Sequence, residues 1–233
     1  MPEYQRAKTS DGRLIHISNV IKGDGQQYRC PACDGQMIPA MGKVMTHHFR
    51  HKATDNCSPE TYLHLVAKYA IAELFNQRKA SGETFYYERM HGVFCGPCSK
   101  TNEMPTFCHE EQQQHDLCKW YDTAHVEKSV DGYIGDVVLE GRHGSMLLEI
   151  CVTHRCEPEK IKSGLKIIEI SLKTEEQLEK ILKACRLTDT SLENNCENRH
   201  CQEECCTTAR VTSYGLKDNY TYLDRCIPKC WER

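Results

Sequence analysis

The sequence predicts an α/β fold, with a core of one helix, three strands, a second helix and a further strand. Two observations lead to it: an amphipathic helix pattern that begins at Ser58, and two strand-like runs within residues 132–153 that a tight turn joins. A third observation, 16 cysteines with paired ligand spacings, adds a zinc-binding N-terminal module, a Cys-rich insertion and a Cys-rich C-terminal tail. The expected N-terminal unit, residues 1–57, contains the β unit and its zinc module. The core spans residues 58–185, with the insertion at about 95–118, and the tail spans residues 186–233.

Composition limits the classes to which the chain can belong. Its 233 residues suffice for one compact core with additions or for two small domains. The longest apolar stretches have the length of strands, far from the roughly 20 residues that a membrane span needs. Residues 1–14 contain no apolar signal segment. We therefore expect a cytoplasmic protein without a membrane span, in which cysteines bind metal rather than form disulfides.

Residues 4–28 are typical of a small β unit. Arg13–Val20 has strand propensity, and Gly23–Gly25 is a turn signal. The next segment, residues 30–57, holds the first cluster of Cys and His side chains.

A helix is expected from Ser58 to about Arg78. Ser58 is a suitable N-cap, and Pro59 suits the first helical position. The apolar positions recur at helical spacing and predict one buried stripe: Leu63, Ala67, Ala70, Ile71 and Leu74. Glu60 and His64 lie on the same stripe, so the helix tip could reach a polar site at one edge of a sheet. The alternative is a frayed helix end with an acid near the helix dipole.

Strands and short helices alternate after this helix. Thr84–Met90 is expected to be the first strand of the core, ahead of the insertion. Two strands then form a hairpin, with Gly141–Gly144 as the turn. A short helix is expected at Pro158–Ser163 and a strand at Lys166–Leu172. The last expected helix runs from Thr174 to about Cys185 and begins with a capping box of Thr174 and Gln177.

Three candidate zinc sites follow from the Cys and His spacings. Tetrahedral zinc takes four such ligands, usually two from each of two short segments. The sets, in chain order, are Cys30, Cys33, His48 and His51; Cys95, Cys98, Cys108 and Cys118; and Cys201, Cys205, Cys226 and Cys230. Competing donors are His47 and Cys57 for the first set, His109 and His115 for the second, and Cys196 and Cys206 for the third.

The zinc modules could bind nucleic acid. Alternatively, their role could be purely structural, if zinc holds together loops whose hydrophobic core is too small for them to fold alone. The net charge of −3 gives no global signature of a nucleic-acid binder. Residues 1–52, however, carry eight Lys and Arg against four Asp and Glu. We expect structural roles for the second and third sites and a mixed role for the first, which has basic neighbours to meet phosphates: Arg29, Lys43, Arg50 and Lys52.

Two acids stand in the otherwise apolar strands of the hairpin. Because side chains alternate along a strand, Asp136 is expected to share a face with Val138, and Glu149 with Leu147 and Cys151. Burying a charge without a partner is costly, and a divalent cation is the simplest partner for two carboxylates. Mg²⁺ or Mn²⁺ would suit these oxygen ligands and could activate an attacking water. The alternative is that each acid pairs with a nearby Arg or Lys.

Asp136, followed after twelve residues by Glu149-Ile-Cys151, resembles the core of the PD-(D/E)XK nuclease superfamily. More closely, residues 28–172, about 60% of the chain, resemble the CoiA-like family of competence-associated proteins. The segments that carry this resemblance are Tyr28–Cys33, His48–His51, the helix with Glu60, His64 and Lys68, Gly135–Leu139 and Leu148–His154. The resemblance implies a restriction-endonuclease-like core and nucleic-acid processing in a bacterial-type setting.

Site roles also follow from the resemblance. By family position, Asp136 and Glu149 would be the ligands of a catalytic metal, and Glu60 would be the acid that the first helix contributes. Cys151 stands where the superfamily usually has a Lys that helps to position the water and to offset charge. Two lysines could reach in from elsewhere, first Lys160 on the short helix and second Lys68.

We therefore expect a metal-dependent nuclease that hydrolyses phosphodiester bonds, in DNA rather than RNA. It would use structural Zn²⁺ and a catalytic Mg²⁺ or Mn²⁺ on Asp136 and Glu149, with Glu60 and His64 assisting. The expected setting is DNA uptake, recombination or defence, with a protein partner from recombination or defence. One alternative is a catalytically inactive zinc-containing nucleic-acid-binding protein of the same fold, and another is a zinc-rich protein-interaction adaptor. A Cys151 nucleophile with a His base is a further enzyme hypothesis.

Overall fold

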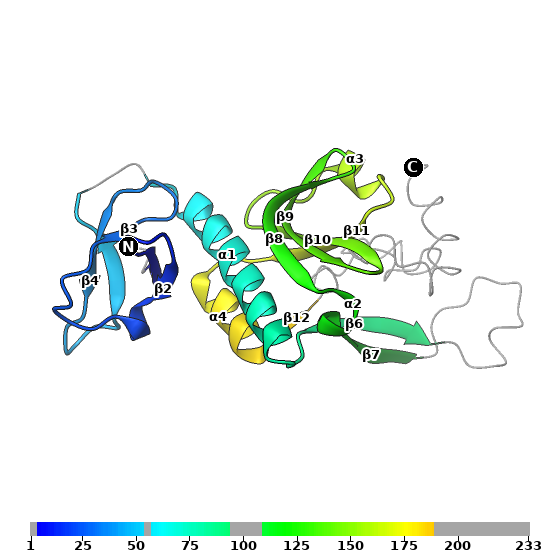
Figure 1. The fold of residues 1–233 in the computed structure, drawn as a ribbon, viewed down its shortest axis with the longest axis horizontal. Coiled ribbons are helices and arrows are strands. Elements are labelled where there is room, and N and C mark those ends of the chain that lie inside the picture. Colours follow the sequence, from blue (N-terminus) through cyan, green and yellow to red (C-terminus); the bar gives the residue numbers. More distant parts are fainter. Residues whose placement is uncertain (1–3, 54–56, 94–108, 189–233) are drawn as a thin grey trace, which may run out of the picture.

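The computed structural model describes residues 4–53, 57–93 and 109–188. In this part of the chain, three β-sheets are arranged around one long helix, α1 (Pro59–Ala80), as Figure 1 shows. Helix α1 lies between the N-terminal sheet and the central sheet, and α4 (Glu175–Ala184) runs beside it. The fold is therefore mixed α/β, with α1 as the element that connects its parts.

The N-terminal sheet is antiparallel and has the order β2-β1-β3-β4-β5. Its strands are β1 (Arg6–Lys8), β2 (Leu14–His16), β3 (Tyr28–Arg29), β4 (Gln36–Ala40) and β5 (His48–His51). A further bridge joins Tyr4 to Phe49, so the chain ahead of β1 also meets β5, the last strand of this order. The strand expected at residues 13–20 is shorter than predicted, because a 3-10 turn, η1 (Ile17–Asn19), follows β2.

Helix α1 begins where the sequence predicted. Ser58 is the N-cap, and its hydroxyl accepts a hydrogen bond of 3.3 Å from the backbone N–H of Thr61. The buried surface is wider than the expected stripe, since Tyr62, Val66 and Phe75 are buried as well. The reason is that α1 contacts both the N-terminal and the central sheet, whereas a single stripe would suit a helix that covers only one layer.

The central sheet has the order β11-β10-β9-β8. Its strands are β8 (Thr123–Val130), β9 (Tyr133–Gly141), β10 (Gly144–Cys151) and β11 (Lys166–Ser171). The first three form an antiparallel meander, and β11 runs parallel to β10 after a crossover that contains the short helix α3 (Pro158–Ile161). The predicted hairpin, short helix and following strand are thus confirmed.

The expected first strand of the core lies in a different sheet. Strand β6 (Tyr86–Val93) pairs with β7 (His109–Asp116) and β12 (Arg186–Thr188), in the order β12-β6-β7. The place next to β9 belongs to β8, so the prediction for residues 84–90 as a core strand is wrong. The polar sequence of β8 concealed it, because one of its faces is exposed.

Apolar side chains pack on both faces of the central sheet. The main core includes Val137, Leu139, Leu148 and Ile150 together with the buried residues of α1. A second, smaller cluster consists of Val138, Leu147 and Ile167, with Val130, Cys156 and Leu165 packed against it. In the described residues, no helix is both long and apolar enough to cross a membrane.

A polar joint connects β1 to the two long helices. The Tyr62 hydroxyl accepts a hydrogen bond from the Arg6 N–H (3.0 Å) and donates to the Arg6 carbonyl (2.8 Å). The Glu175 carboxylate, at the start of α4, accepts from the Gln5 N–H (2.8 Å) and lies 3.1 Å from the Tyr62 hydroxyl, whose single hydrogen it shares with the Arg6 carbonyl. Burial raises the pKa of Glu175 to about 7, against the opposing effect of these hydrogen bonds. The Arg6 guanidinium pairs with Glu179 of α4.

Candidate functional site

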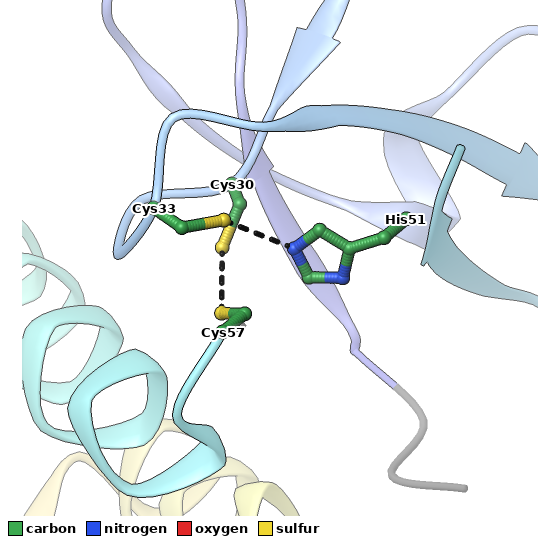
Figure 2. Close-up of side chains that lie close together, drawn as sticks. All are labelled: Cys30, Cys33, His51 and Cys57. Carbon is green, nitrogen blue, oxygen red and sulfur yellow. Dashed lines mark hydrogen bonds between the residues drawn. The ribbon is translucent and has the colours of Figure 1, made fainter. Parts of the chain in front are cut away.

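Four side chains form a candidate metal centre between the N-terminal sheet and α1. Figure 2 shows that Cys30, Cys33, His51 and Cys57 point toward one another, and their ligand atoms all lie within 4.8 Å of one another. The Cys30 and Cys57 sulfurs are 3.5 Å apart, and Cys33 Sγ lies 3.3 Å from His51 Nε2. Two ligands of a tetrahedral zinc ion should lie about 3.5–3.8 Å apart, given Zn–S and Zn–N bonds of about 2.3 and 2.0 Å. This cluster could therefore bind a zinc ion.

The turn between β3 and β4 builds half of this centre. Asp34 has φ of 57°, and its N–H donates to the carbonyl of Cys30 (3.0 Å), while the Cys30 N–H donates to the carbonyl of Gly35 (2.9 Å). The N–H of Ala32 points at Cys30 Sγ (3.4 Å). An N–H aimed at a sulfur stabilises a thiolate, so the local backbone suits a ligand cysteine.

The ligand set differs from the predicted one at one position. Strand β5 carries both His48 and His51, which are three residues apart, and side chains alternate along a strand. The two rings consequently cannot face the same site, and His48 Nδ1 instead contacts the carbonyl of Thr46 (2.9 Å). Cys57, a competing donor in the sequence, completes the group from the segment just ahead of α1. The expected H-x2-H pair would have required a helix or a tight turn at this place.

Burial raises the pKa of two thiols in this centre, those of Cys30 and Cys57. The pKa of Cys30 is raised, and that of Cys57 rises to about 12 because of burial and the neighbouring Cys30. A metal ion requires thiolate ligands, so its binding must displace these protons. Tyr4 packs edge-on against His51, with ring centroids 5.0 Å apart, and against Tyr62 of α1 at 4.6 Å. The metal centre is thereby in contact with α1 through Tyr4 as well as through Cys57.

The second and third predicted zinc sites fall largely or wholly outside the described residues. Of the second set, only Cys118 is described; it is buried in α2 (Leu117–Trp120), and burial raises the pKa of its thiol. Cys95, Cys98 and Cys108 lie outside the described residues, as do Cys201, Cys205, Cys226 and Cys230. The four basic residues around the first centre are exposed, and Arg29 forms an ion pair with Asp34 (3.2 Å).

An acidic cavity of about 480 Å³ opens at one end of the central sheet. The hairpin supplies Asp136 from β9 and Glu149 from β10, the two acids that the sequence singled out. Helix α1 contributes His64, and α3 contributes Lys160. Residues from four different helices and strands thus line one cavity.

Asp136 is held by three donors. His64 Nε2 lies 3.0 Å from Oδ2, Lys68 Nζ lies 3.0 Å from Oδ1, and the Ile150 N–H donates to Oδ2 at 2.8 Å. Burial alone would raise the pKa of Asp136, but these three interactions outweigh it and lower the pKa to about 2. The carboxylate is therefore ionised throughout the physiological range.

Glu149 is in a different environment. One of its oxygens, Oε2, accepts a hydrogen bond of 2.7 Å from Lys160 Nζ, which also donates to the Ile134 carbonyl at 2.5 Å. The other oxygen, Oε1, is buried and has no hydrogen-bond partner among the residues that the structure describes. Burial raises the pKa of Glu149, and the charge of Asp136 adds to this, against the opposing effect of Lys160. An acceptor that is both buried and unpartnered is costly unless a ligand binds it.

The sheet separates at the two acids. The β9–β10 ladder ends at the pair Val137–Leu148, so Asp136 and Glu149 are not paired as the next residues would be. The Ile150 N–H bonds the Asp136 side chain instead of a strand partner. Strict alternation predicted that Asp136 would share the face of Val138, but its carboxylate reaches α1 while Val138 packs on the opposite face. That expectation is wrong because the strand is irregular at this point.

Gly135 leaves room for two buried side chains next to Asp136. A Cβ atom at this position would lie 2.7 Å from Val138 Cγ2 and 2.9 Å from Leu147 Cγ, closer than real contacts. A larger residue would displace the buried side chains of Val138 and Leu147, which pack together in the smaller core cluster.

The remaining predicted site residues are divided between the cavity and the surface. Cys151 lines the cavity and is buried, and burial raises the pKa of its thiol. His154 also lines the cavity. Glu60 is exposed and is not among the lining residues, so the structure does not bring it to the two acids. Both lysines considered as replacements for the missing cation reach an acid, Lys160 at Glu149 and Lys68 at Asp136.

Sequence reasoning missed two charged residues near the acids. Arg155 lines the cavity and follows the end of β10. Glu127 of β8 contacts Lys68 Nζ at 3.0 Å. The signal for Glu127 was hidden because β8 itself was not recognised as a strand beside β9.

Comparison with protein families links the N-terminal part of the chain to a known family. Residues 16–60 match the family model described as competence protein CoiA, N-terminal domain. This segment is about a fifth of the chain and contains all four residues of the candidate zinc centre. No curated protein and no solved structure matched the chain. The expected CoiA resemblance is thus confirmed for the N-terminal segment, and the PD-(D/E)XK assignment of the later residues stays a prediction.

Proposed function

We propose that the protein is a metal-dependent nuclease that acts on DNA, with the acidic cavity as its active site and a PD-(D/E)XK-type core. The observation that carries the proposal is the convergence of Asp136, Glu149 and Lys160 on one cavity from β9, β10 and α3. The CoiA match of residues 16–60 supports a role in competence, and hence in the handling of incoming DNA.

The two acids suit a hard divalent cation. Mg²⁺ is usually bound through one or two carboxylates and keeps several waters, so it does not need a full protein cage. In the described residues, only the Cys₃His group brings three ligand atoms within 4.8 Å of one another, so the acids would supply two carboxylates at most. The buried Oε1 of Glu149 has no hydrogen-bond partner in residues 4–53, 57–93 and 109–188, and a cation would satisfy it.

Each protein group has a separate task under this proposal. When bound, the cation would polarise the scissile phosphate and lower the pKa of the attacking water. His64 and the Ile150 N–H fix the orientation of the Asp136 carboxylate. Lys160 supplies, from α3, the positive charge that the superfamily usually takes from the position of Cys151. A cation beside the phosphate stabilises the charge that develops in the transition state.

A second candidate function is that of a zinc-containing nucleic-acid-binding protein without catalysis. The observation that favours it is the pairing of each acid with a Lys, Asp136 with Lys68 and Glu149 with Lys160. Ion pairs of this kind can be purely structural, because each charge already has a partner. The two candidates differ in one measurable property, which is cleavage.

The test is cleavage of labelled single- and double-stranded DNA and RNA with Mg²⁺ or Mn²⁺. The parent protein is compared with Glu149→Gln, which keeps the shape of the side chain but removes its charge. The matched control is Glu159→Gln, since Glu159 is exposed on α3 and does not line the cavity.

Cleavage by the parent and the control, reduced at least about a hundredfold in Glu149→Gln, is the expected result. Equal cleavage by all three proteins would mean that the activity comes from elsewhere or from a contaminant. Binding of DNA by all three without cleavage would favour the second candidate function.

A further inference from the structure

Glu127 has an unusual backbone for a residue in a strand. Its φ is 52°, in the left-handed region that residues other than glycine rarely adopt. The β8–β9 ladder skips this residue: Val126 pairs with Val137 and Lys128 with Gly135, and the pair between them, Glu127 and Asp136, is missing. Such outliers gather at functional sites, where the surrounding structure holds them in place.

The irregularity changes which face of the sheet the β8 side chains cover. Val126 packs against the main core, on the side of α1, whereas Val130 packs against the small cluster on the other side. Regular alternation would put two residues four apart on the same face. The neighbouring strand changes in the same place, since the Asp136 carboxylate reaches α1 and Val138 does not. Both strands are thus distorted at the two residues that face Lys68.

Lys68 is held between the two acids. Its ammonium lies 3.0 Å from Asp136 Oδ1 and 3.0 Å from Glu127 Oε1, and its side chain is only 7% exposed. The Glu127 side chain is about half exposed, at 52%, whereas that of Asp136 is buried to a greater extent, at 17%. Lys68 consequently occupies one of the two carboxylate oxygens that Asp136 can offer to a divalent cation, and it has a second acceptor, Glu127, beside it.

We propose that Glu127 is a positioning residue that controls cation binding at Asp136 by acting on Lys68. This inference rests on the proposed function of the acidic cavity. With Glu127 present, the Lys68 ammonium keeps one carboxylate partner when a cation takes Asp136 Oδ1, so it need not be left buried and unpaired. Without Glu127, Lys68 has only Asp136, and the cation must compete for it with the full charge of the ammonium.

The experiment measures Mn²⁺ binding by the zinc-replete full chain, using electron paramagnetic resonance of free Mn²⁺. Four proteins are compared: the parent, Glu127→Gln, Lys68→Met and the double variant. We expect Glu127→Gln to raise the Kd for Mn²⁺ about three- to tenfold, a range that allows for the exposure of Glu127. Lys68→Met should lower the Kd, since it removes the competing charge. In the Lys68→Met background, Glu127→Gln should have less than a twofold effect.

A backbone control separates the carboxylate from the strained conformation. Glu127→Gly removes both the acid and the cost of the left-handed backbone, so it should fold at least as well as the parent yet bind Mn²⁺ as weakly as Glu127→Gln. Parent-like binding by both Glu127 variants would overturn the inference, as would an effect of Glu127→Gln that persists in the Lys68→Met background. Failure of the parent itself to bind Mn²⁺ at the acids would instead defeat the proposed function together with this inference.

Discussion

Replacing Lys160 by Met should expose the cost of the buried Glu149 charge. The Lys160–Glu149 pair spans 2.7 Å, and the two side chains are only 11% and 12% exposed. Within the described part of the chain, the second oxygen of Glu149 has no hydrogen-bond partner. Removal of one partner of a buried ion pair costs about 3–5 kcal/mol, because it leaves a buried charge without compensation. We expect a loss of that size in the free energy of unfolding at pH 8.

The loss should depend on pH in a defined direction. Burial already raises the pKa of Glu149, and without Lys160 it must rise further above the ordinary value of 4.5. The folded state of the variant then binds a proton more tightly than the unfolded state. Its stability is greatest below the unfolded pKa and falls as the pH rises through the folded pKa, by about 1.4 kcal/mol for each pH unit that separates the two pKa values. At pH 5 we expect a loss of only about 1–2 kcal/mol, mainly the hydrogen bond to the Ile134 carbonyl.

Urea denaturation followed by circular dichroism at pH 5 and pH 8 measures both losses. The matched control is Lys180→Met, whose partner Glu176 is exposed, and which should change stability by less than about 0.5 kcal/mol. Adding Glu149→Gln to Lys160→Met should restore much of the free energy of unfolding at pH 8. The loss relative to the parent should then be similar at pH 5 and pH 8. A loss of equal size at both pH values would refute the reasoning, because the missing charge would then not be its cause.

Three other outcomes are expected. Cys57→Ser should lower the zinc content of the purified protein, measured by mass spectrometry, by about one equivalent, while His48→Ala should leave the zinc content unchanged. Loss of zinc in His48→Ala but not in Cys57→Ser would instead support the ligand set predicted from the sequence. Glu175→Gln should stabilise the protein at pH 8 by about 1–2 kcal/mol and have little effect at pH 4. The reason is that the parent loses stability as the pH rises through the Glu175 pKa of about 7. A gain of equal size at both pH values in urea denaturation would contradict this expectation. Gly141→Ala should lower the free energy of unfolding by about 1–3 kcal/mol, since the added Cβ would lie 2.5 Å from the Trp120 carbonyl oxygen. Gly42→Ala is the control, because the space around Gly42 is open, and it should leave the free energy of unfolding nearly unchanged in the same assay.

Local signals in the sequence predicted the elements that have strong caps or clear alternation. Ser58 fixed the start of α1, and Thr174 fixed that of α4, because a side-chain oxygen at an N-cap satisfies a backbone donor. The hairpin of β9 and β10 was equally clear, since both strands are buried and the turn has two glycines. Strand β8 was not, because most of its residues are polar and one of its faces is exposed.

Spacing alone could not choose the zinc ligands. Both a helix-like H-x2-H pair and a Cys57 ligand satisfy the count of four, and only the strand conformation of β5 excludes His48. The contact of Lys160 with Glu149 was accessible to sequence reasoning, because α3 follows β10 closely. The contact of Lys68 with Glu127 was not, since it depends on a left-handed residue that no motif marks.

The joint between β1, α1 and α4 restricts how such proteins can exchange parts during evolution. Tyr62 bonds both backbone groups of Arg6, and Glu175 bonds the N–H of Gln5, while Cys57 contributes a side chain to the candidate metal centre from the chain that enters α1. A gene fusion that joined the N-terminal sheet of one relative to the helices of another would have to preserve all these contacts at once. Among homologues, the positions of Tyr62 and Glu175 should therefore change together, and chimaeras that break the chain between β5 and α1 should fold poorly unless both sides come from the same parent.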